Sequence, residues 1–241
     1  MSGESEGRLA DLDRRELEQA QFIADVSHEL RTPLTILRGI IEVAIEGERS
    51  ADEYRQALSE TLVEVQHLIR ISENLLFLSR GTSGRVTMSL SRVELRRFVE
   101  TTAEDFEAAA ADKGLTLAFS ASVERAEVLG DKNRLKEVLH NLLENAIRYT
   151  EKGRVEVRVE ASGGSAILVV EDTGVGIDEK DMPHVFDRFF RSDRARRAYR
   201  GGSGLGLSIV RWIVEAHKGQ ARVESTLGGG SRFVVALPLI G

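Results

Sequence analysis

His28 and Glu29 are the first residues in the chain whose types suit chemistry. An imidazole attacks an electrophile through an unprotonated ring nitrogen. A neighbouring carboxylate can hydrogen-bond the other ring N–H, which fixes the tautomer and strengthens the nucleophile. Apolar residues recur every three to four positions from Ile23 to Ala44, which predicts a helix with one buried stripe. His28 flanks that stripe, so we expect its ring to face water; an exposed histidine on a coiled coil would show the same pattern.

Asn141, Asn145 and Arg148 form a second group, spaced by four and three residues. That spacing places them on one face of a helix predicted over residues 132–148. Neutral amides and a guanidinium on one face suit a nucleoside triphosphate with Mg²⁺, which takes oxygen ligands from phosphates, water and one or two protein groups. Asparagines on helices also cap or hydrogen-bond their neighbours, and the spacing alone is compatible with both interpretations.

Residues 172–177 (DTGVGI) follow a predicted strand. Gly174 and Gly176 would let the backbone approach a flat ligand closely. The carboxylate of Asp172, at the strand end, can accept a hydrogen bond from the exocyclic amine of adenine, whereas guanine has a carbonyl at that position. An ordinary Asp-Thr-Gly turn would contain the same residues.

Residues 201–207 (GGSGLGL) lead directly into a helix predicted over residues 205–217. The backbone N–H groups of this segment, at a helix N-terminus, favour anions such as phosphates. Its candidate nucleotide-binding residues are Gly202, Gly204, Leu205 and Gly206. A flexible loop is the alternative. A dinucleotide-binding fingerprint is not favoured, because the preceding strand and the downstream acidic residue of that fingerprint are missing.

An aromatic and arginine-rich segment, residues 186–200, lies between the two glycine-rich segments. The aromatic residues would anchor a mobile loop, and the arginines would neutralise phosphates. Some of these arginines would equally suit a solvated basic loop, so none is assigned alone. The other histidines are expected to be structural or exposed: His67, His140, His184 and His217.

Two long helices are predicted to carry the first group. The first runs from about residue 8 to residue 45 or 46, and Ser50 or Asp52 is the expected N-cap of the second. Gly81 and Gly84 would end the second helix. One hairpin cannot cover the apolar stripes of both helices, so we expect a second copy to complete a four-helix bundle. Packing against the rest of the same chain is the alternative.

The remaining residues alternate between helices and strands, which predicts an α+β domain with a mixed sheet and helices on one face. Asp131 is the expected N-cap of the helix over 132–148. The predicted domains are a helical hairpin over residues 8–80, a linker over 81–87 and the α+β domain over 88–241. The predicted order is strand 88–90, helix 93–112, strand 115–120, helix 132–148, hairpin 154–171, helix 205–217 and hairpin 220–237.

Composition bounds these expectations. The chain has 241 residues, of which 41% are hydrophobic and 30% charged, enough for one large or two modest domains. A net charge of -6 argues against broad nucleic-acid binding. The absence of cysteine excludes disulfides and thiolate metal sites and fits a reducing compartment. No signal peptide and no apolar run of roughly 20 residues is evident.

Residues 27–34 (SHELRTPL), preceded by Phe22, resemble the H box of bacterial sensor histidine kinases of two-component systems. Three further segments resemble, in the family's order, the N, G1 and G2 boxes of the histidine kinase and gyrase-type ATPase superfamily: 140–150, 172–177 and 201–207. Residues 186–191 resemble the F box that precedes an ATP lid. The resemblance covers nearly all of residues 22–240. It implies a dimeric phosphotransfer hairpin followed by an ATP-binding α/β sandwich.

The resemblance also implies roles for individual residues. His28 would accept the phosphoryl group of ATP, which then passes to an aspartate of a response regulator. Asn145 would bind Mg²⁺, Tyr149 would lie near the base, and the other two residues of that helix face would lie nearer the phosphates. Thr32, with a water, would support dephosphorylation of the regulator. The expected location is cytoplasmic, with any membrane attachment through segments outside this chain.

Two alternatives stay open. Relatives that hydrolyse ATP, such as chaperones, topoisomerases and mismatch-repair ATPases, carry a glutamate four residues before the Mg²⁺-binding asparagine. Asn141 stands there in this chain, which favours phosphoryl transfer. A degenerate kinase that serves only as a dimeric phosphotransfer scaffold is the other alternative, and intact motifs argue against it.

Overall fold

The computed structural model describes the backbone of residues 2–82, 88–199 and 202–240, and the side chains of 23–76, 88–197, 199 and 202–240. The chain divides into two compact units, Met1–Leu76 and Phe77–Gly241. Gly84, Arg200 and Gly201 fall outside the described residues, as does the side chain of Phe22.

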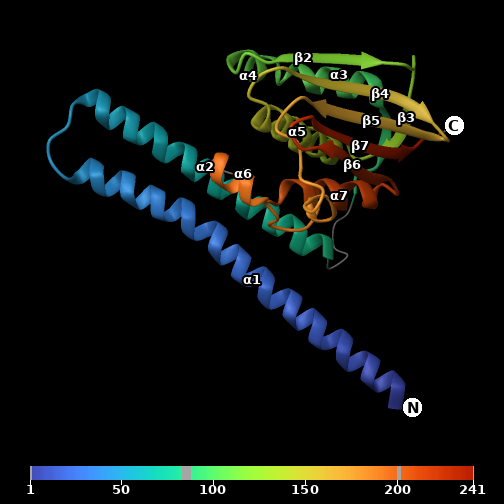
Figure 1. Cartoon of the computed structure of the whole chain (residues 1–241), viewed down its shortest axis with the longest axis horizontal. Coiled ribbons are helices and arrows are strands. Elements are labelled where there is room, and N and C mark those ends of the chain that lie inside the picture. The colour runs from blue at the N-terminus through green and yellow to red at the C-terminus, as the bar shows by residue number, and fades with distance from the viewer. Residues whose placement is uncertain (1, 83–87, 200–201, 241) are drawn as a thin grey trace. The chain divides into compact units, whose positions relative to one another are not determined.

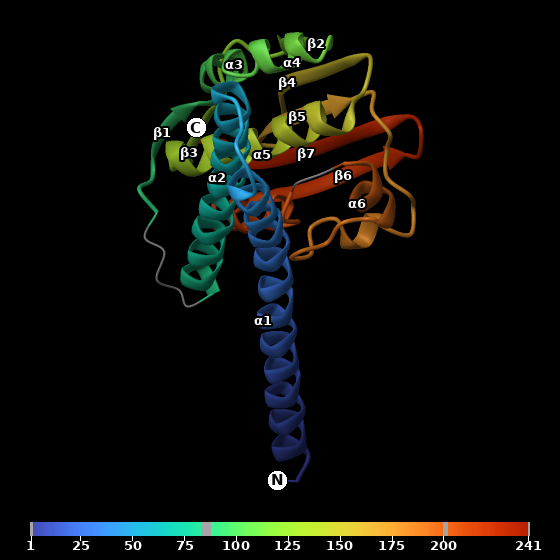
Figure 2. The ribbon, with the colours of Figure 1, turned by 90° about the vertical axis from the view of Figure 1, so that its left-hand side faces the viewer.

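Two antiparallel helices form the first unit (Figure 1). Helix α1 spans Ser2–Ile45 and helix α2 begins at Ala51 and ends at Thr82. Figure 2 shows α1 as one continuous helix, and Pro33 lies within it. Its start is six residues before the predicted one. Helix α2 ends at Thr82, between Gly81 and Gly84, the two glycines predicted to end it.

A reciprocal cap begins α2. The Ser50 hydroxyl oxygen accepts from the Glu53 N–H at 3.3 Å, and the Glu53 carboxylate accepts from the Ser50 N–H at 2.8 Å. This capping box gives partners to N–H groups that have none within the helix. The Ser50 N–H and the Ser50 hydroxyl both donate to the Glu53 carboxylate, and these hydrogen bonds lower the pKa of Glu53. Of the two predicted N-caps, Ser50 is therefore confirmed, and Asp52 lies in the first turn.

A mixed five-stranded sheet organises the second unit, with the strand order β2-β4-β5-β7-β6. Only the β2–β4 pair is parallel, and the other pairs are antiparallel. The strands are β2 Thr116–Ala121, β4 Arg154–Ser162, β5 Ser165–Asp172, β6 Gln220–Thr226 and β7 Gly230–Pro238. A separate antiparallel ribbon joins β1 Ser91–Glu94 to β3 Glu127–Gly130.

Helices α3, α5 and α7 pack on one face of the sheet (Figure 1). Alternate residues of β4, such as Val155 and Val157, are buried, and so are apolar side chains of α5, which contacts β4, such as Leu139 and Leu143. The helices are α3 Leu95–Glu104, α4 Glu107–Asp112, α5 Lys132–Tyr149, α6 Asp193–Ala198, α7 Gly206–Ala216 and the 3₁₀ turn η1 Met182–His184. This is the predicted α+β sandwich, and Asp131 is the N-cap of α5, as predicted.

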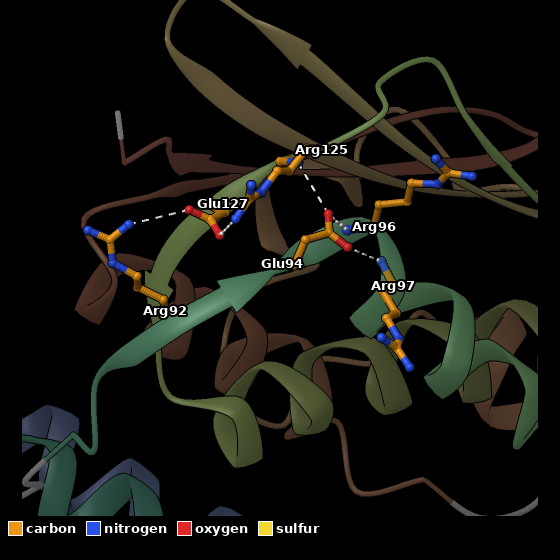
Figure 3. A network of polar contacts seen from close by, with 7 residues as sticks. Arg92, Glu94, Arg96, Arg97, Arg125 and Glu127 are labelled. Atoms are coloured by element: carbon orange, nitrogen blue, oxygen red, sulfur yellow. Dashed lines mark hydrogen bonds and ion pairs between the residues drawn. The ribbon is translucent and has the colours of Figure 1, made fainter.

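The predicted strand over 88–90 and helix over 93–112 were wrong in detail. The strand is β1, at 91–94, and the helix breaks at residues 105–106 into α3 and α4. Glu94 ends the strand because its carboxylate accepts from the N–H groups of Arg96 and Arg97, which begins α3 (Figure 3). It also accepts from the Ala126 N–H at 3.2 Å, which ties α3 to the segment entering β3.

Strand β3 has no counterpart in the prediction. It is held by residues distant in sequence, since it pairs with β1 and its Val128 also bridges to Leu239. At its exposed side Glu127 binds the guanidinium groups of Arg92 and Arg125 (Figure 3). Among the described residues, we find no helix that is both long enough and apolar enough to span a membrane.

Candidate functional site

His28 lies on the surface of α1. Its side chain is exposed, as the sequence predicts, and Glu29 beside it is half-buried. Thr32, one turn later, is also exposed, and its hydroxyl donates to the His28 carbonyl oxygen at 3.4 Å. The first group of candidate residues thus places a solvent-accessible imidazole and a threonine hydroxyl on consecutive turns of one helix.

The second group lies on the last turns of α5. The Asn141 amide donates to the Glu137 carbonyl oxygen at 2.8 Å, so one of its N–H groups is already used within the helix. Asn145 is half-buried, and among the described residues nothing hydrogen-bonds its side chain. Its amide oxygen is therefore available for a ligand. Arg148 and Tyr149, both half-buried, complete the turn.

Asp172 ends β5 as a buried carboxylate, with 6% of the residue exposed. Burial raises its pKa to about 6, although hydrogen bonds from the backbone N–H groups of Gly174 and Ser231 oppose the shift. The Gly174 N–H bond is 2.8 Å long and goes to Oδ1. A carboxylate at a strand end with this little water around it can accept a hydrogen bond from a ligand with considerable selectivity.

The turn after Asp172 closes against α5. The Val175 N–H donates to the Tyr149 carbonyl oxygen at 3.1 Å. A Cβ on Gly174 would overlap that same carbonyl oxygen, so only glycine permits this approach. Gly176, in the next turn, lies against the backbone of Thr226 at the end of β6. The segment 172–177 therefore packs against the C-terminal end of α5, which carries Arg148 and Tyr149.

The last glycine-rich segment also reaches α5. Gly206 opens α7 and lies against the Asn141 side chain, where a Cβ would overlap the amide oxygen. Gly202 lies against the Arg148 guanidinium, and Gly204 lies against the backbone of Phe189. Leu205 is fully buried as the N-cap residue of α7. The two glycine-rich segments, 172–177 and 202–207, thus both contact the helix that carries the candidate asparagines, and the contacts are made at Asn141, Arg148 and Tyr149.

The segment between the glycine-rich loops carries α6. Tyr199, which follows α6, contacts Tyr149 edge to face, with ring centroids 5.0 Å apart. Phe189 is buried, and the Phe186 ring lies 6.4 Å from that of Phe233. These contacts fit the expected anchoring role of the aromatic residues.

Arg191 has a role that the sequence did not reveal. Its guanidinium donates to the carbonyl oxygens of Tyr199 at 2.8 Å, Gly202 at 3.0 Å and Ala195 at 3.3 Å. It therefore fastens the segment that contains α6 to the glycine-rich loop. By contrast, three neighbouring arginines are more accessible to solvent: Arg194, Arg196 and Arg197.

The remaining histidines agree with the expectation of structural or exposed positions. His217 is buried, with Nδ1 at 2.7 Å from the Ile213 carbonyl oxygen and Nε2 accepting from the Asp131 N–H at 2.9 Å. His140 contacts the Phe106 ring edge to face. His184 is exposed and pairs with Asp187, and His67 is half-buried. None of the four belongs to the candidate groups on α5, at the end of β5 or before α7.

Comparison with known families matches both parts of the chain. Residues 18–84 match the family "His Kinase A (phospho-acceptor) domain". Residues 130–241 match the family "Histidine kinase-, DNA gyrase B-, and HSP90-like ATPase".

The individual proteins that are similar to this chain are also histidine kinases. The sensor histidine kinase CusS of Escherichia coli is 37% identical over 221 residues, which cover 91% of this chain and 45% of CusS. YclK of Bacillus subtilis, also a sensor histidine kinase, is 33% identical over 95% of this chain and 48% of its own length. Among solved structures, the histidine kinase AdeS of Acinetobacter baumannii aligns with a TM-score of 0.70 at 26% identity, covering 89% of this chain and 98% of that one. The chain thus spans about half the length of the curated relatives that it matches.

Proposed function

The chain belongs to the sensor histidine kinases of two-component systems, and from that premise we propose that it transfers the γ-phosphoryl group of ATP to His28 and then to an aspartate of a response regulator. The observation that carries this proposal is a division of labour. One unit presents the exposed imidazole of His28. The other brings together, near the end of α5, the Asp172 carboxylate as a hydrogen-bond acceptor for adenine, the available amide oxygen of Asn145 and two glycine-rich segments.

The proposed nucleotide site follows from the geometry of the second unit. The buried Asp172 carboxylate accepts from the exocyclic amine of adenine, and Gly174 lets the turn after it pack closely against the end of α5. Tyr149, whose carbonyl oxygen accepts from the Val175 N–H of this turn, contacts the ring of Tyr199. Arg148, with the backbone N–H groups of the loop before α7, faces the phosphates. The site residues that we assign to the nucleotide also include Asn141, Asn145, Gly176, Gly202, Gly204, Leu205 and Gly206.

Mg²⁺ fits the donors of this site. The Asn145 amide oxygen is a hard ligand with no partner among the described residues, and phosphate oxygens and water would supply the other ligands of the ion. When bound, the ion would neutralise charge on the phosphates. Hydrolysis of ATP is less well supported, because Asn141 at the position of a general base cannot accept a proton and already donates to Glu137.

In the proposed reaction an unprotonated ring nitrogen of His28 attacks the γ-phosphorus, and the bond from that phosphorus to the bridging oxygen of ADP breaks. Glu29 hydrogen-bonds the other ring N–H and stabilises the positive charge that develops on the ring. In the second step an aspartate oxygen of the regulator attacks the same phosphorus, and the His28 nitrogen is the leaving group. We assign Thr32, one turn from His28, to a water-mediated dephosphorylation of the regulator.

A second copy of the chain is the proposed partner of the hairpin. Apolar side chains on both helices are exposed, with 68% of Leu58 and 56% of Leu62 accessible, and burying a leucine is worth about 1.5–3 kcal/mol. A four-helix bundle made from two hairpins would cover them. The functional division that we propose keeps residues 8–80 as the dimerisation and phosphotransfer hairpin, 81–87 as the linker and 88–241 as the ATP-binding domain.

The proposal is tested by incubating the chain with ATP labelled on the γ-phosphate, followed by acid and alkali treatment of the protein. We expect label that is lost in acid and kept in alkali, as for phosphohistidine, and no label on Asp172→Asn at low ATP. A nucleotide titration separates the alternatives. Binding without phosphohistidine would indicate a degenerate scaffold, and steady release of inorganic phosphate without labelled protein would indicate an ATPase.

A further inference from the structure

The C-terminal turn of α5 has every carbonyl of its last four residues bound. A helix end leaves such carbonyls without partners inside the helix. Here Thr150 binds the first and the Val175 N–H binds the last, as the turn after β5 closes. The two central ones, of Ile147 and Arg148, both accept from the ammonium group of Lys113, at 2.7 and 2.8 Å.

Lys113 comes from a different part of the sandwich. It is the C-cap residue of the short helix α4, shortly before β2, and lies 35 positions before Arg148 in the sequence. Its ammonium is partly withdrawn from water, and this burial lowers its pKa. A cation at a helix C-terminus also stabilises the negative end of the helix dipole. The contact is therefore a charged clamp on two consecutive peptide groups.

The clamped peptides carry the side chains of the nucleotide site. Arg148 contributes one clamped carbonyl and reaches Gly202 with its guanidinium. Tyr149 follows immediately and contacts Tyr199. A shift of these peptides would move both side chains together, and misplacing a binding group by a fraction of an ångström weakens its contribution.

We propose that Lys113 is a positioning residue for ATP: by holding the carbonyls of Ile147 and Arg148, it fixes the last turn of α5 and thereby orients Arg148 and Tyr149 toward the nucleotide. The inference rests on the proposed function. It differs from an ordinary cap, which would stabilise the fold and leave nucleotide affinity unchanged once the protein is folded.

The test is a titration of the whole chain with a non-hydrolysable ATP analogue, at a temperature where circular dichroism shows each variant to be folded. Lys113→Met should weaken binding about tenfold, since a hydrogen bond to a charged group contributes on that scale. Lys113→Arg, which keeps a cation with several donors, should bind within about twofold of wild type. If Lys113→Met does not fold, Lys113→Gln, which keeps an N–H donor, replaces it.

Lys136→Met is the matched control. Lys136 is on α5 itself, but its ammonium pairs with the exposed Asp105, at 2.9 Å, away from the last turn of the helix. This variant should bind like wild type. Autophosphorylation adds a second readout: Lys113→Met should raise the KM for ATP about tenfold and change kcat at saturating ATP by less than about twofold.

Equal affinity of folded Lys113→Met and wild type would overturn the inference, as would a Lys113→Arg variant as weak as Lys113→Met. These results leave the proposed function intact. Wild type that binds the analogue but forms no phosphohistidine would instead refute the kinase proposal while the Lys113 comparison still stands. Wild type that does not bind the analogue would refute both.

Discussion

The helical hairpin and the sandwich bury their apolar side chains to very different extents. Among the described side chains, thirteen large apolar residues of α1 and α2 are exposed, against three in the sandwich. The sandwich instead encloses residues such as Leu139 and Ile209, with no exposed surface at all. A unit that completes its own core can bind a small molecule by itself, whereas a unit with uncovered apolar helices needs another protein surface.

The chemistry is divided in the same way. The hairpin places His28 on a regular helix, with its side chain exposed to solvent. The sandwich brings residues from α5, the end of β5 and the loop before α7 into contact at one helix end. The comparison therefore predicts that substitutions in one unit change its own property and leave that of the other unchanged.

Replacement of His28 by alanine should have the largest effect. We expect no labelled phosphohistidine, because no other side chain replaces the nucleophile. Nucleotide affinity should stay within about twofold of wild type, since His28 belongs to the hairpin unit and the candidate nucleotide-binding residues belong to the other unit. Autophosphorylation and an analogue titration on the same preparation measure both. Residual acid-labile label on the variant, or a loss of nucleotide binding, would contradict the assignment of the nucleophile to one unit and of nucleotide binding to the other.

Substitutions in the exposed apolar stripe of the hairpin should have the next largest effect, on dimer formation. Leu58→Glu together with Leu62→Glu places charges where a second copy should pack, and an unpaired buried charge costs several kcal/mol. We expect light scattering to show a dimer for wild type and a monomer for the variant, with unchanged nucleotide affinity. Arg55→Ala on the same helix is the control, because Arg55 is exposed and pairs with exposed Asp52. A wild-type monomer at micromolar concentration would contradict the proposed bundle.

Asp172 gives a pH-dependent test of the sandwich. Its pKa is raised to about 6, so the carboxylate gains a proton as the pH falls through 6 and loses its acceptor for adenine. Affinity for the ATP analogue should therefore decrease from pH 7.5 to 5. Asp172→Asn should bind roughly 10 to 100 times more weakly at pH 7.5, with a flatter pH dependence. Protonation of the nucleotide itself affects both proteins equally, so it cancels when the pH dependence of Asp172→Asn is subtracted from that of wild type.

The raised pKa of Asp172 affects the free energy of unfolding in the opposite direction to nucleotide affinity. A carboxyl whose pKa is higher in the folded state than in the unfolded state binds its proton preferentially when folded. The contribution of Asp172 to the free energy of unfolding is therefore present below its ordinary pKa and is lost as the pH rises through about 6. Urea titrations of the nucleotide-free protein at pH 4.5 and 7 should show this difference for wild type and not for Asp172→Asn. Equal pH dependence in both proteins would mean that another group titrates.

The sequence predicted features that depend on local pattern and missed those that depend on distant partners. Asp131 and Ser50 were identifiable as caps because a cap acts within a few residues. Strand β3 was not, since its pairing with β1 and Leu239 crosses long stretches of chain. The motifs identified the candidate nucleotide-binding residues, but not how these residues contact one another.

Lys113 and Arg191 were missed for a related reason. Both bind backbone carbonyls, and a carbonyl carries no residue type that a sequence pattern could reveal. Lys113 precedes a helix-ending glycine, which by itself indicates only a turn. Arg191 was one of several arginines in a basic segment, and only the structure distinguishes it from its neighbours.

Thr32→Ala should separate two activities within the hairpin. We expect the dephosphorylation of a phosphorylated regulator to fall roughly tenfold or more, because a positioned water loses its partner, while autophosphorylation changes less than about twofold. Thr35→Ala is a matched control, since its hydroxyl donates to the Arg31 carbonyl oxygen at 2.8 Å in the same way that Thr32 donates to His28. If Thr32→Ala lowers both activities equally, Thr32 does not have the separate role that we propose.

The smallest effect comes from the cap at the start of α2. Ser50→Ala removes the hydroxyl that accepts from Glu53, and loss of an N-cap costs about 1 kcal/mol of helix stability. The only tryptophan, Trp212 on α7, reports the sandwich, whereas far-ultraviolet circular dichroism also follows the long helices. We therefore expect the circular dichroism transition to move to lower urea and the Trp212 fluorescence transition to stay in place.

A double-mutant cycle of Ser50→Ala with Glu53→Gln sharpens this result, because the two side chains cap each other. The pKa of Glu53 is lowered in the folded state, mainly by hydrogen bonds from Ser50, so the coupling is present above the ordinary pKa of glutamate. It is lost as the pH falls through the lowered value, because the carboxylate then gains a proton. Coupling that persists in acid would show that the cap does not depend on the charge of Glu53. Movement of the Trp212 transition with Ser50→Ala would show that the hairpin and the sandwich unfold together, and the separation between them would then fail at the level of stability.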